Sequence, residues 1–345
     1  EHLKRYTTTG MAPDQGKTSN LNALRLLGRV TGREPSAIGT TRFRPPYVPV
    51  RLGALAGREF GSRAAPLRRL PIHDRHVALG GVMEDHSGWL RAACYPAPGE
   101  SETDAVRREI VAAREAVAIL DSSSLGKIEV CGPDAARFLD RIYANRVDNL
   151  KVGRCRYGMM LNENGIIMDD GVLSRLADDL FLVSSSSAGT AEVCLKLEEW
   201  LQTEWPHLDV LVHNATTQWA TFAVSGPWSR AVIGAVLPEA DLSSAFPHMA
   251  IQTGRSGPMP FRLLRVSFTG ERSYELNVPA TAAAAVWQSL TDAGAAYGIT
   301  PIGMEALDML RLEKAYLEVG VHTQTDTTPD DLGSGEAIAP KPGDF

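Results

Sequence analysis

Apolar and polar residues alternate most regularly between residues 154 and 173, on both sides of a short polar stretch. The segment reads RCRYGMMLNENGIIMDDGVL, and the polar stretch Asn-Glu-Asn-Gly lies at residues 162–165. Alternation with a period of two residues is typical of strands, and Asn and Gly favour the turn between them. The pattern therefore predicts a β-hairpin.

Two adjacent acids lie late in the second predicted strand. Because side chains alternate between the faces of a strand, Asp170 should share one face with Ile166, Met168 and Val172, while Asp169 should point to the other face. One of the two carboxylates is then poorly solvated, and such a group needs a donor, a cation or a ligand. The pair is a candidate site. A hairpin whose acids both face water is the alternative that the pattern leaves open.

A helical period predicts further elements on both sides of this hairpin. Residues 72–79 form a short predicted helix, and residues 103–120 a long one whose apolar positions are spaced by three and four, with Ser101 or Thr103 as the cap. Later strands are expected at residues 180–184, 208–213, 263–268 and 274–278, and later helices at residues 188–204, 280–293 and 304–315. Within the hairpin at residues 266–278, Glu275 taken alone would face solvent.

A weak repeat links residues 127–133 with residues 221–227. Each copy leads from a predicted strand through Gly-Pro into a predicted helix, at residues 135–143 and 229–237, and we expect Pro in the first helical turn. Neither copy has the glycine spacing of a phosphate-binding loop. Local strand pairs with interspersed helices favour an α+β fold with antiparallel or mixed sheets and two similar subdomains.

Composition narrows the function classes. The formal net charge of -6 argues against a nucleic-acid partner, and no apolar run is long enough to cross a membrane. We expect a cytoplasmic protein without a signal peptide. The four cysteines are widely separated and indicate neither zinc nor disulfides, and His73 and His76 are expected to cap or pack rather than bind a metal.

Turn-forming residues divide the chain. Residues 1–68 show little period and predict a linking arm, residues 69–330 carry the regular elements, and residues 331–345 look like the start of another domain.

Four blocks in the middle region resemble the folate-binding aminomethyltransferase family, the T-protein of glycine cleavage. They occur in the family's order, at residues 69–81, 157–170, 268–275 and 310–313. Residues 2–17 and 39–49 resemble the segment that links the dinucleotide-binding part of heterotetrameric sarcosine oxidase alpha subunits to their folate domain. The resemblance implies the family's three-lobed fold.

The resemblance also assigns roles to residues. It implies that Asp170 is the catalytic acid near the reactive nitrogens of tetrahydrofolate and that Glu275 binds the pterin. The other positions that it places along the folate cavity are Tyr157, Leu125, Val172 and Ser184. Two residues depart from the family pattern, because Leu307 replaces a folate-contacting arginine and Phe268 replaces a tyrosine.

The activity implied is transfer of a one-carbon unit from an oxidised N-methyl amine to tetrahydrofolate, which gives 5,10-methylenetetrahydrofolate. FAD, FMN and NAD are expected only on absent parts or on partner subunits, including a flavin-bearing beta subunit. A glycine-cleavage aminomethyltransferase is an alternative, although the arm argues against it. A folate-binding or assembly module without catalysis is another.

Overall fold

The computed structural model describes residues 2–11, 14–42, 48, 50–57 and 66–334. Parts of both arm motifs, and residues 335–345 of the expected C-terminal domain, lie outside these ranges. The chain separates into two units, residues 1–66 and residues 67–345.

The first unit contains helices where the sequence predicted little regular structure. They are α1 (His2–Thr7), α2 (Asn20–Thr31), α3 (Pro35–Ile38) and α4 (Leu52–Ala56). Helix α2 ends at Gly32, whose left-handed φ of 66° lets its N–H reach the Gly28 carbonyl. The Lys4 ammonium donates to the Arg42 carbonyl at 2.8 Å and ties two distant stretches of the unit together. In the described part of the chain, no helix has the length and apolar character needed to span a membrane.

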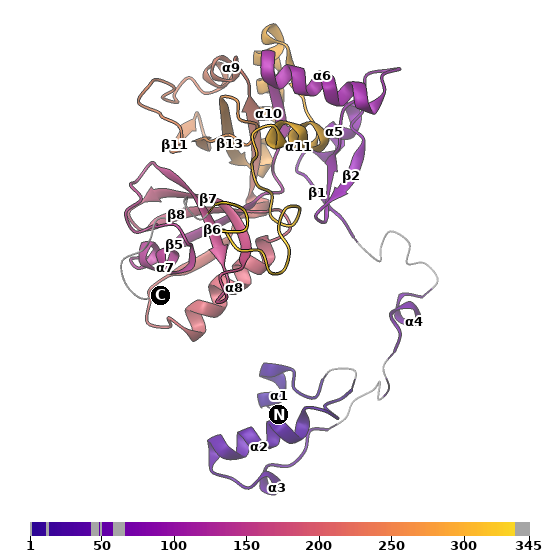
Figure 1. The fold of residues 1–345 in the computed structure, drawn as a ribbon, viewed down its shortest axis with the longest axis vertical. Coiled ribbons are helices and arrows are strands. Elements are labelled where there is room, and N and C mark those ends of the chain that lie inside the picture. The colour runs from indigo at the N-terminus through magenta and orange to yellow at the C-terminus, as the bar shows by residue number, and fades with distance from the viewer. Residues whose placement is uncertain (1, 12–13, 43–47, 49, 58–65, 335–345) are drawn as a thin grey trace. The chain divides into compact units, whose positions relative to one another are not determined.

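The second unit is built on three sheets (Figure 1). A six-stranded sheet has the order β11 (Ala250–Ser256), β12 (Met259–Arg265), β13 (Ser273–Pro279), β10 (Trp219–Ser225), β4 (Val117–Asp121) and β14 (Ile299–Pro301). A five-stranded sheet has the order β6 (Cys155–Leu161), β7 (Ile167–Ala177), β8 (Leu180–Ser185), β5 (Gly126–Cys131) and β9 (Leu211–Asn214). A small third sheet contains β1 (Arg68–Arg69), β3 (Trp89–Ala92) and β2 (Met83–His86).

Most strand pairs are antiparallel, and β4–β14 and β1–β3 are parallel. The predicted α+β class with mixed sheets is therefore confirmed. The remaining helices are α5 (His73–Ala78), α6 (Glu102–Glu115), α7 (Ala135–Ile142), α8 (Thr190–Thr203), α9 (Ser229–Val236), α10 (Ala283–Gly294) and α11 (Met304–Leu312).

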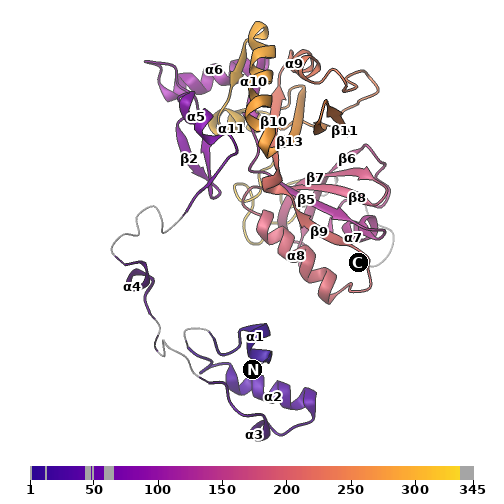
Figure 2. The same cartoon turned by 180° about the vertical axis from the view of Figure 1, so that it is seen from behind.

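Each large sheet has its own helices and its own core. Phe222, Tyr274 and Trp287 are fully buried where α9 and α10 pack on the six-stranded sheet. Phe138 and Phe181 are fully buried where α7 and α8 cover the five-stranded sheet. The view from behind shows α8 beside β9, and α10 beside β10 and β13 (Figure 2). One face of each large sheet thus packs against its own helices and forms a separate core.

The predicted helix at residues 103–120 was wrong at its C-terminal end. Helix α6 ends at Glu115, and Val117–Asp121 is strand β4, which pairs with β10 and β14. Val117 and Ile119 are fully buried in the six-stranded sheet. All five residues of β4 are buried, so the strand shows no alternation of apolar and polar residues. Its apolar residues therefore extended the helical spacing of α6 by coincidence.

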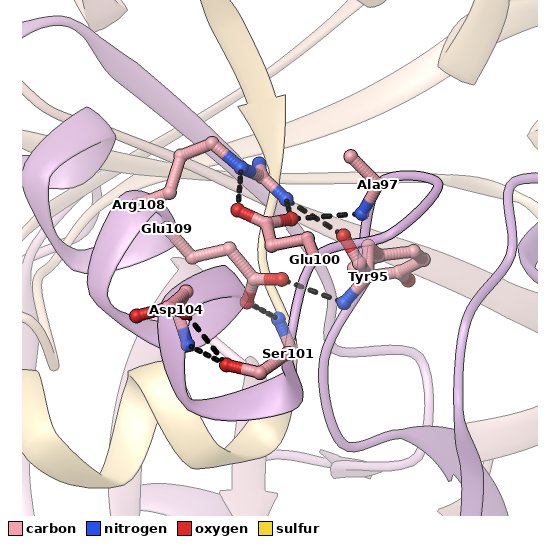
Figure 3. A network of polar contacts seen from close by, with 8 residues as sticks. Tyr95, Ala97, Glu100, Ser101, Asp104, Arg108 and Glu109 are labelled. Carbon is pink, nitrogen blue, oxygen red and sulfur yellow. Dashed lines mark hydrogen bonds and ion pairs between the residues drawn. The ribbon is translucent and has the colours of Figure 1, made fainter.

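Polar contacts connect α6 to the segment that follows the small third sheet (Figure 3). Ser101 caps the helix as predicted and accepts the Asp104 N–H at 3.2 Å. About two turns later, the fully buried Glu109 accepts the N–H of Tyr95 and the N–H of Gly303, both at 2.7 Å. The Glu109 carboxylate therefore connects the end of the small sheet to the start of α11.

The Gly-Pro repeat occurs at β5–α7 and at β10–α9. Pro133 and Pro227 lie in turns before the helices, so the expectation of Pro in the first helical turn was wrong. The preceding glycines have φ of 130° (Gly132) and 121° (Gly226). A Cβ on Gly132 would lie 2.2 Å from the Asp209 carbonyl oxygen, so both the backbone conformation and the close approach need glycine there.

The chain crosses between the two large sheets twice, through neighbouring segments. It passes from β4 to β5 through residues 122–125 and returns from β9 to β10 through residues 215–218. Lys127 joins the crossings, because its N–H donates to Thr216 Oγ1 at 3.1 Å and its carbonyl accepts the Ala215 N–H at 2.8 Å. Near the other side of the five-stranded sheet, the Cys155 N–H donates to the Met249 carbonyl at 2.9 Å.

Candidate functional site

The predicted hairpin is present as β6 and β7, joined at residues 162–165. Its register shifts between Met160, which pairs with Asp169, and Leu161, which pairs with Ile167. Met168 is therefore the extra residue of a β-bulge, and it packs against the core of the five-stranded sheet. The prediction that Met168 shares the face of Asp170 was wrong for this reason.

Asp169 is the more buried of the two acids, with 3% of its surface exposed. Its carboxylate accepts the Ser186 N–H, at 3.1 Å for the nearer oxygen. Burial, with a smaller contribution from the charge of Asp170, raises the pKa of Asp169 to about 6. Asp169 thus has a backbone partner and fastens β7 to the turn after β8.

Asp170 is partly exposed and has a different partner. The Tyr157 hydroxyl donates to Asp170 Oδ2 at 2.7 Å. Burial raises the pKa of Asp170, while this hydrogen bond lowers it and offsets part of the effect. A partly accessible carboxylate with a raised pKa is a stronger base than an ordinary aspartate, so Asp170 is suited to accept a proton.

One row of side chains crosses the five-stranded sheet beside Asp170. Tyr157 pairs with Val172, and Ser184 pairs with Lys127. The register of β7 with β8, in which Leu173 pairs with Val183, continues to place Val172 next to Ser184. Tyr157, Val172 and Ser184 are partly exposed, whereas the alternate residues Leu173 and Val183 are fully buried in the core. The row therefore lies on the face that the core does not use.

Glu275 occupies the corresponding face of the six-stranded sheet. Its neighbours Tyr274 and Leu276 are fully buried in the core, so the Glu275 side chain points to the opposite face, where it is only partly exposed. Burial raises the pKa of Glu275 to about 7, against a smaller lowering by the Lys127 charge. Glu275 is therefore not a well-solvated surface acid.

Contacts between the sheets show that these two faces lie opposite each other. Arg262 on β12 forms an ion pair of 2.5 Å with Glu129 on β5, and its guanidinium lies 4.0 Å from the centre of the Trp219 ring. Leu264 on β12 packs in one apolar cluster with Leu182 on β8. Because Glu129 is two residues from Lys127, the facing surfaces include the row that contains the predicted residues.

The structure thus places five of the six predicted residues on two facing sheets and the sixth between them. Leu125, which is partly exposed, lies in the first crossing segment. All six keep some exposure, although each has at least one neighbour in the chain that is buried. If the two faces packed together completely, these inward-facing positions would be buried, so the sheets do not close over them.

Lys127 was missed by the sequence prediction, although it ends the row. Only 3% of its surface is exposed, and its ammonium donates to the carbonyls of Ser123 at 3.1 Å and Leu125 at 2.9 Å. Burial lowers the pKa of Lys127 to about 8, against the opposing effects of Asp121 and Glu275. The sequence did contain one signal for Lys127: it is a charged residue at the start of the strand-like run Lys-Ile-Glu-Val, residues 127–130.

A second polar chain approaches Lys127 from the small sheet. The Tyr95 hydroxyl bonds His76 Nδ1, and His76 Nε2 bonds Asp121 Oδ2, both at 2.9 Å. All three residues are buried. His76 therefore packs between two side chains, and in the described ranges no group of three His, Cys, Asp or Glu residues has the arrangement of a metal site.

A comparison with family models identifies the fold that carries this site. Residues 72–341 match the model of the GCVT N-terminal domain, and residues 1–58 match that of the sarcosine oxidase A3 domain. The chain belongs to the GCVT aminomethyltransferase family. The predicted family is confirmed.

Relatives of this aminomethyltransferase-family chain fall into two groups. It is 46% identical to the sarcosine oxidase subunit alpha of Corynebacterium sp. (strain P-1), over all of this chain and 36% of that protein. It is 34% identical to the aminomethyltransferase of Streptomyces coelicolor, over 81% of this chain and 72% of that protein. The chain thus spans about a third of the length of the alpha subunits that it matches.

A solved structure agrees with the family assignment. The aminomethyltransferase T of the glycine cleavage system from Bartonella henselae aligns with a TM-score of 0.69 and 27% identity, over 79% of this chain and 70% of that one.

The two residues that the sequence analysis expected to depart from the family pattern have structural partners here. Leu307 packs in the cluster between α6 and α11, and Phe268 stacks on Tyr316 with ring centres 6.1 Å apart.

Proposed function

We propose that this chain contains a tetrahydrofolate site and transfers a one-carbon unit to that acceptor, as the folate domain of a sarcosine oxidase alpha-like subunit. The observation that carries the proposal is the placement of Asp170 and Glu275 on facing sheets, both with raised pKa values and both partly accessible. Partly buried acids with raised pKa values are typical of functional sites.

The two acids suit two parts of a reduced folate. A carboxylate has two coplanar acceptor oxygens, which match the ring N–H and the amino group of a pterin, and we assign this role to Glu275. Tyr157, Val172, Ser184 and Leu125 would form the surrounding walls. Asp170 would lie at the reacting nitrogens, held in place by the Tyr157 hydroxyl.

The proposed reaction joins a carbon at the oxidation level of formaldehyde to two folate amines. Two C–N bonds form, two N–H protons leave, and water is released to give 5,10-methylenetetrahydrofolate. Asp170 would accept a proton as a C–N bond forms and steady the positive charge on nitrogen. The methyl group of an N-methyl amine would supply the carbon, after a flavin on another subunit has oxidised that amine by two electrons. The match of residues 1–58 to the A3 domain favours this setting over a separate glycine-cleavage enzyme.

The test uses the assembled oxidase and 5-formyltetrahydrofolate as a stable ligand. We expect calorimetry to detect its binding to the wild-type protein, and Glu275→Ala to lose about 1–3 kcal/mol of that binding free energy, because a charged hydrogen-bond partner is removed. Asp170→Asn should keep the affinity within about threefold, because the shape is conserved, but should release formaldehyde in place of methylenetetrahydrofolate.

Three results would contradict the proposal: no folate binding by the wild-type protein, an unchanged affinity in Glu275→Ala, or unchanged transfer in Asp170→Asn. If binding survives in Asp170→Asn and transfer is also unchanged, Asp170 has no catalytic part.

A further inference from the structure

Lys127 is the buried cation nearest in the sheet to the predicted folate residues, and nothing in the proposed reaction uses it. It stands at the end of the row Tyr157–Val172–Ser184–Lys127. Along β5, Ile128 and Val130 are fully buried in the core of the five-stranded sheet. Because side chains alternate between the two faces of a strand, Lys127 and Glu129 point to the other face, toward the six-stranded sheet. The ion pair of Glu129 with Arg262 confirms this direction.

The Lys127 ammonium has three N–H donors, and two of them bind carbonyls of the crossing segment. These bonds fix the turn that carries Leu125. The same turn is held from its other side, because the Ser123 hydroxyl accepts the Thr221 N–H at 2.9 Å and Asp121 Oδ1 accepts the Ser123 N–H at 2.9 Å. The ammonium is therefore bound to the crossing segment, which Thr221 in turn holds to β10 of the six-stranded sheet.

The charges that act on Lys127 come from three sides. Asp121 at the end of β4 and Glu275 on β13 favour the ammonium, while Arg91 on β3 opposes it. Asp121 already has a partner in His76, and the Arg91 side chain is engaged with the Asp121 carbonyl at 3.3 Å. Lys127 is the only side chain whose charge lowers the pKa of Glu275 among the effects that shift it. The Lys127 charge thus favours the ionised form of Glu275, against the larger effect of burial.

We propose that Lys127 is a positioning residue of the folate site, which keeps the Glu275 carboxylate ionised for the pterin donors and holds Leu125 against the ligand. This inference rests on the proposed function. It adds a residue on the opposite sheet to the binding of the pterin, so that both sheets determine the affinity. A consequence is that the affinity requires Glu275 without its proton and Lys127 with its proton.

The ionisation requirement predicts a bell-shaped dependence of binding on pH. Affinity should fall below about pH 7 as Glu275 takes up a proton, and above about pH 8 as Lys127 loses one. Because the two groups interact, the acid and alkaline limbs of the binding profile report apparent pKa values of the pair rather than of single residues.

The experiment measures the dissociation constant of 5-formyltetrahydrofolate from pH 6 to pH 10 by calorimetry, on the assembled oxidase. Lys127→Met keeps the length of the side chain and removes its charge. We expect its affinity at pH 7 to fall at least tenfold, its acid limb to move to higher pH, and its alkaline limb to vanish. Lys127→Arg stays charged, so its acid limb should remain near that of the wild-type protein and its alkaline limb should move beyond pH 10.

Lys196→Met is the matched control, because Lys196 lies on α8 of the same lobe and pairs with Glu199 on the surface. It should leave the whole profile unchanged. If Lys127→Met lowers the affinity equally at every pH, or leaves it unchanged while the wild-type protein binds the ligand, the inference is wrong and the folate site stands. If the wild-type protein does not bind the ligand, the proposed function itself is wrong.

Discussion

The Tyr157 hydroxyl lies 2.7 Å from Asp170 Oδ2, although the two residues are not opposite each other in the hairpin. Asp170 pairs with Met159, and Tyr157 pairs with Val172, so the bond runs diagonally across β6 and β7. This diagonal contact fixes the carboxylate on the face that looks toward the other sheet. Tyrosine is thereby part of the acid's environment, and removing its hydroxyl should change how Asp170 titrates.

Tyr157→Phe should raise the pKa of Asp170, because it removes the donor that stabilises the carboxylate. If Asp170 acts as the base, the acid limb of the transfer rate should move up by about one pH unit, with about a tenfold loss of rate at the foot of the limb. The pH profile of methylenetetrahydrofolate formation measures this effect. Tyr297→Phe, in which the tyrosine stacks on Trp228, is the control. An unshifted limb would exclude Asp170 as the titrating base.

Glu275 should lower the stability of the fold at alkaline pH. Its pKa in the folded protein, about 7, lies above the ordinary value of 4.5. Below pH 4.5 both the folded and the unfolded states hold the proton, and the carboxyl has no net effect. Between pH 4.5 and about pH 7 the unfolded state has released the proton while the folded state still holds it, so the free energy of unfolding decreases as the pH rises and levels off above pH 7.

Glu275→Gln should therefore stabilise the protein by about 1–3 kcal/mol at pH 8 and by little at pH 4.5. Urea denaturation at the two pH values measures the difference. Glu163→Gln, at the exposed turn of the hairpin, should show no such dependence. Equal effects of Glu275→Gln at both pH values would mean that burial does not control this carboxyl.

Glu109→Ala should destabilise the second unit. The carboxylate is fully buried and accepts the backbone N–H of Tyr95 (Figure 3) as well as that of Gly303. Alanine would leave both donors unpaired in the interior, at a cost of about 2–5 kcal/mol. The urea midpoint should fall accordingly, while Glu115→Ala, at an exposed position of the same helix, should change it little. A fall no larger than that of the control would show that water replaces the carboxylate.

Arg262→Met should weaken the contact between the two large sheets. It removes the ion pair with Glu129 and the stacking on Trp219, and we expect a loss of about 1–3 kcal/mol in the free energy of unfolding. Because the sheets carry Asp170 and Glu275 separately, folate affinity should fall as well. Arg255→Met, where the arginine bonds only its own turn through the Pro258 carbonyl, is the comparison. Full retention of affinity would mean that the facing sheets are held by other contacts.

Local patterns in the sequence were sufficient for the hairpin, the acid pair and the Gly-Pro repeat. Each is set by residues close together in the chain, such as the turn at residues 162–165 or the paired Asp169 and Asp170. The bulge at Met168 could not be predicted, because both registers bury an apolar side chain in that part of β7. It depends on pairing with β6 and on packing against the core.

The facing of the two sheets was also beyond the sequence pattern. Glu275 alone looked like a solvent-facing acid, and its partial burial comes from strands distant in the chain. Lys127 was missed for the same reason, since the groups that affect it, Asp121 and Glu275, lie on the other large sheet. The resemblance to the family supplied Glu275. No local pattern distinguishes a lysine that points into a site from one that points into water.

The neighbouring crossings between the sheets have a consequence for the architecture. Strands β4 and β10 are antiparallel partners, with Asp121 paired to Phe222, yet the chain inserts a whole lobe between them. If residues 122–218 were excised and the cut ends joined by a short turn, the pairing of the remaining strands would be that of an ordinary hairpin. The six-stranded sheet would then fold without the inserted lobe, which carries the five-stranded sheet. It would retain Glu275 but none of the residues of the five-stranded sheet that face it.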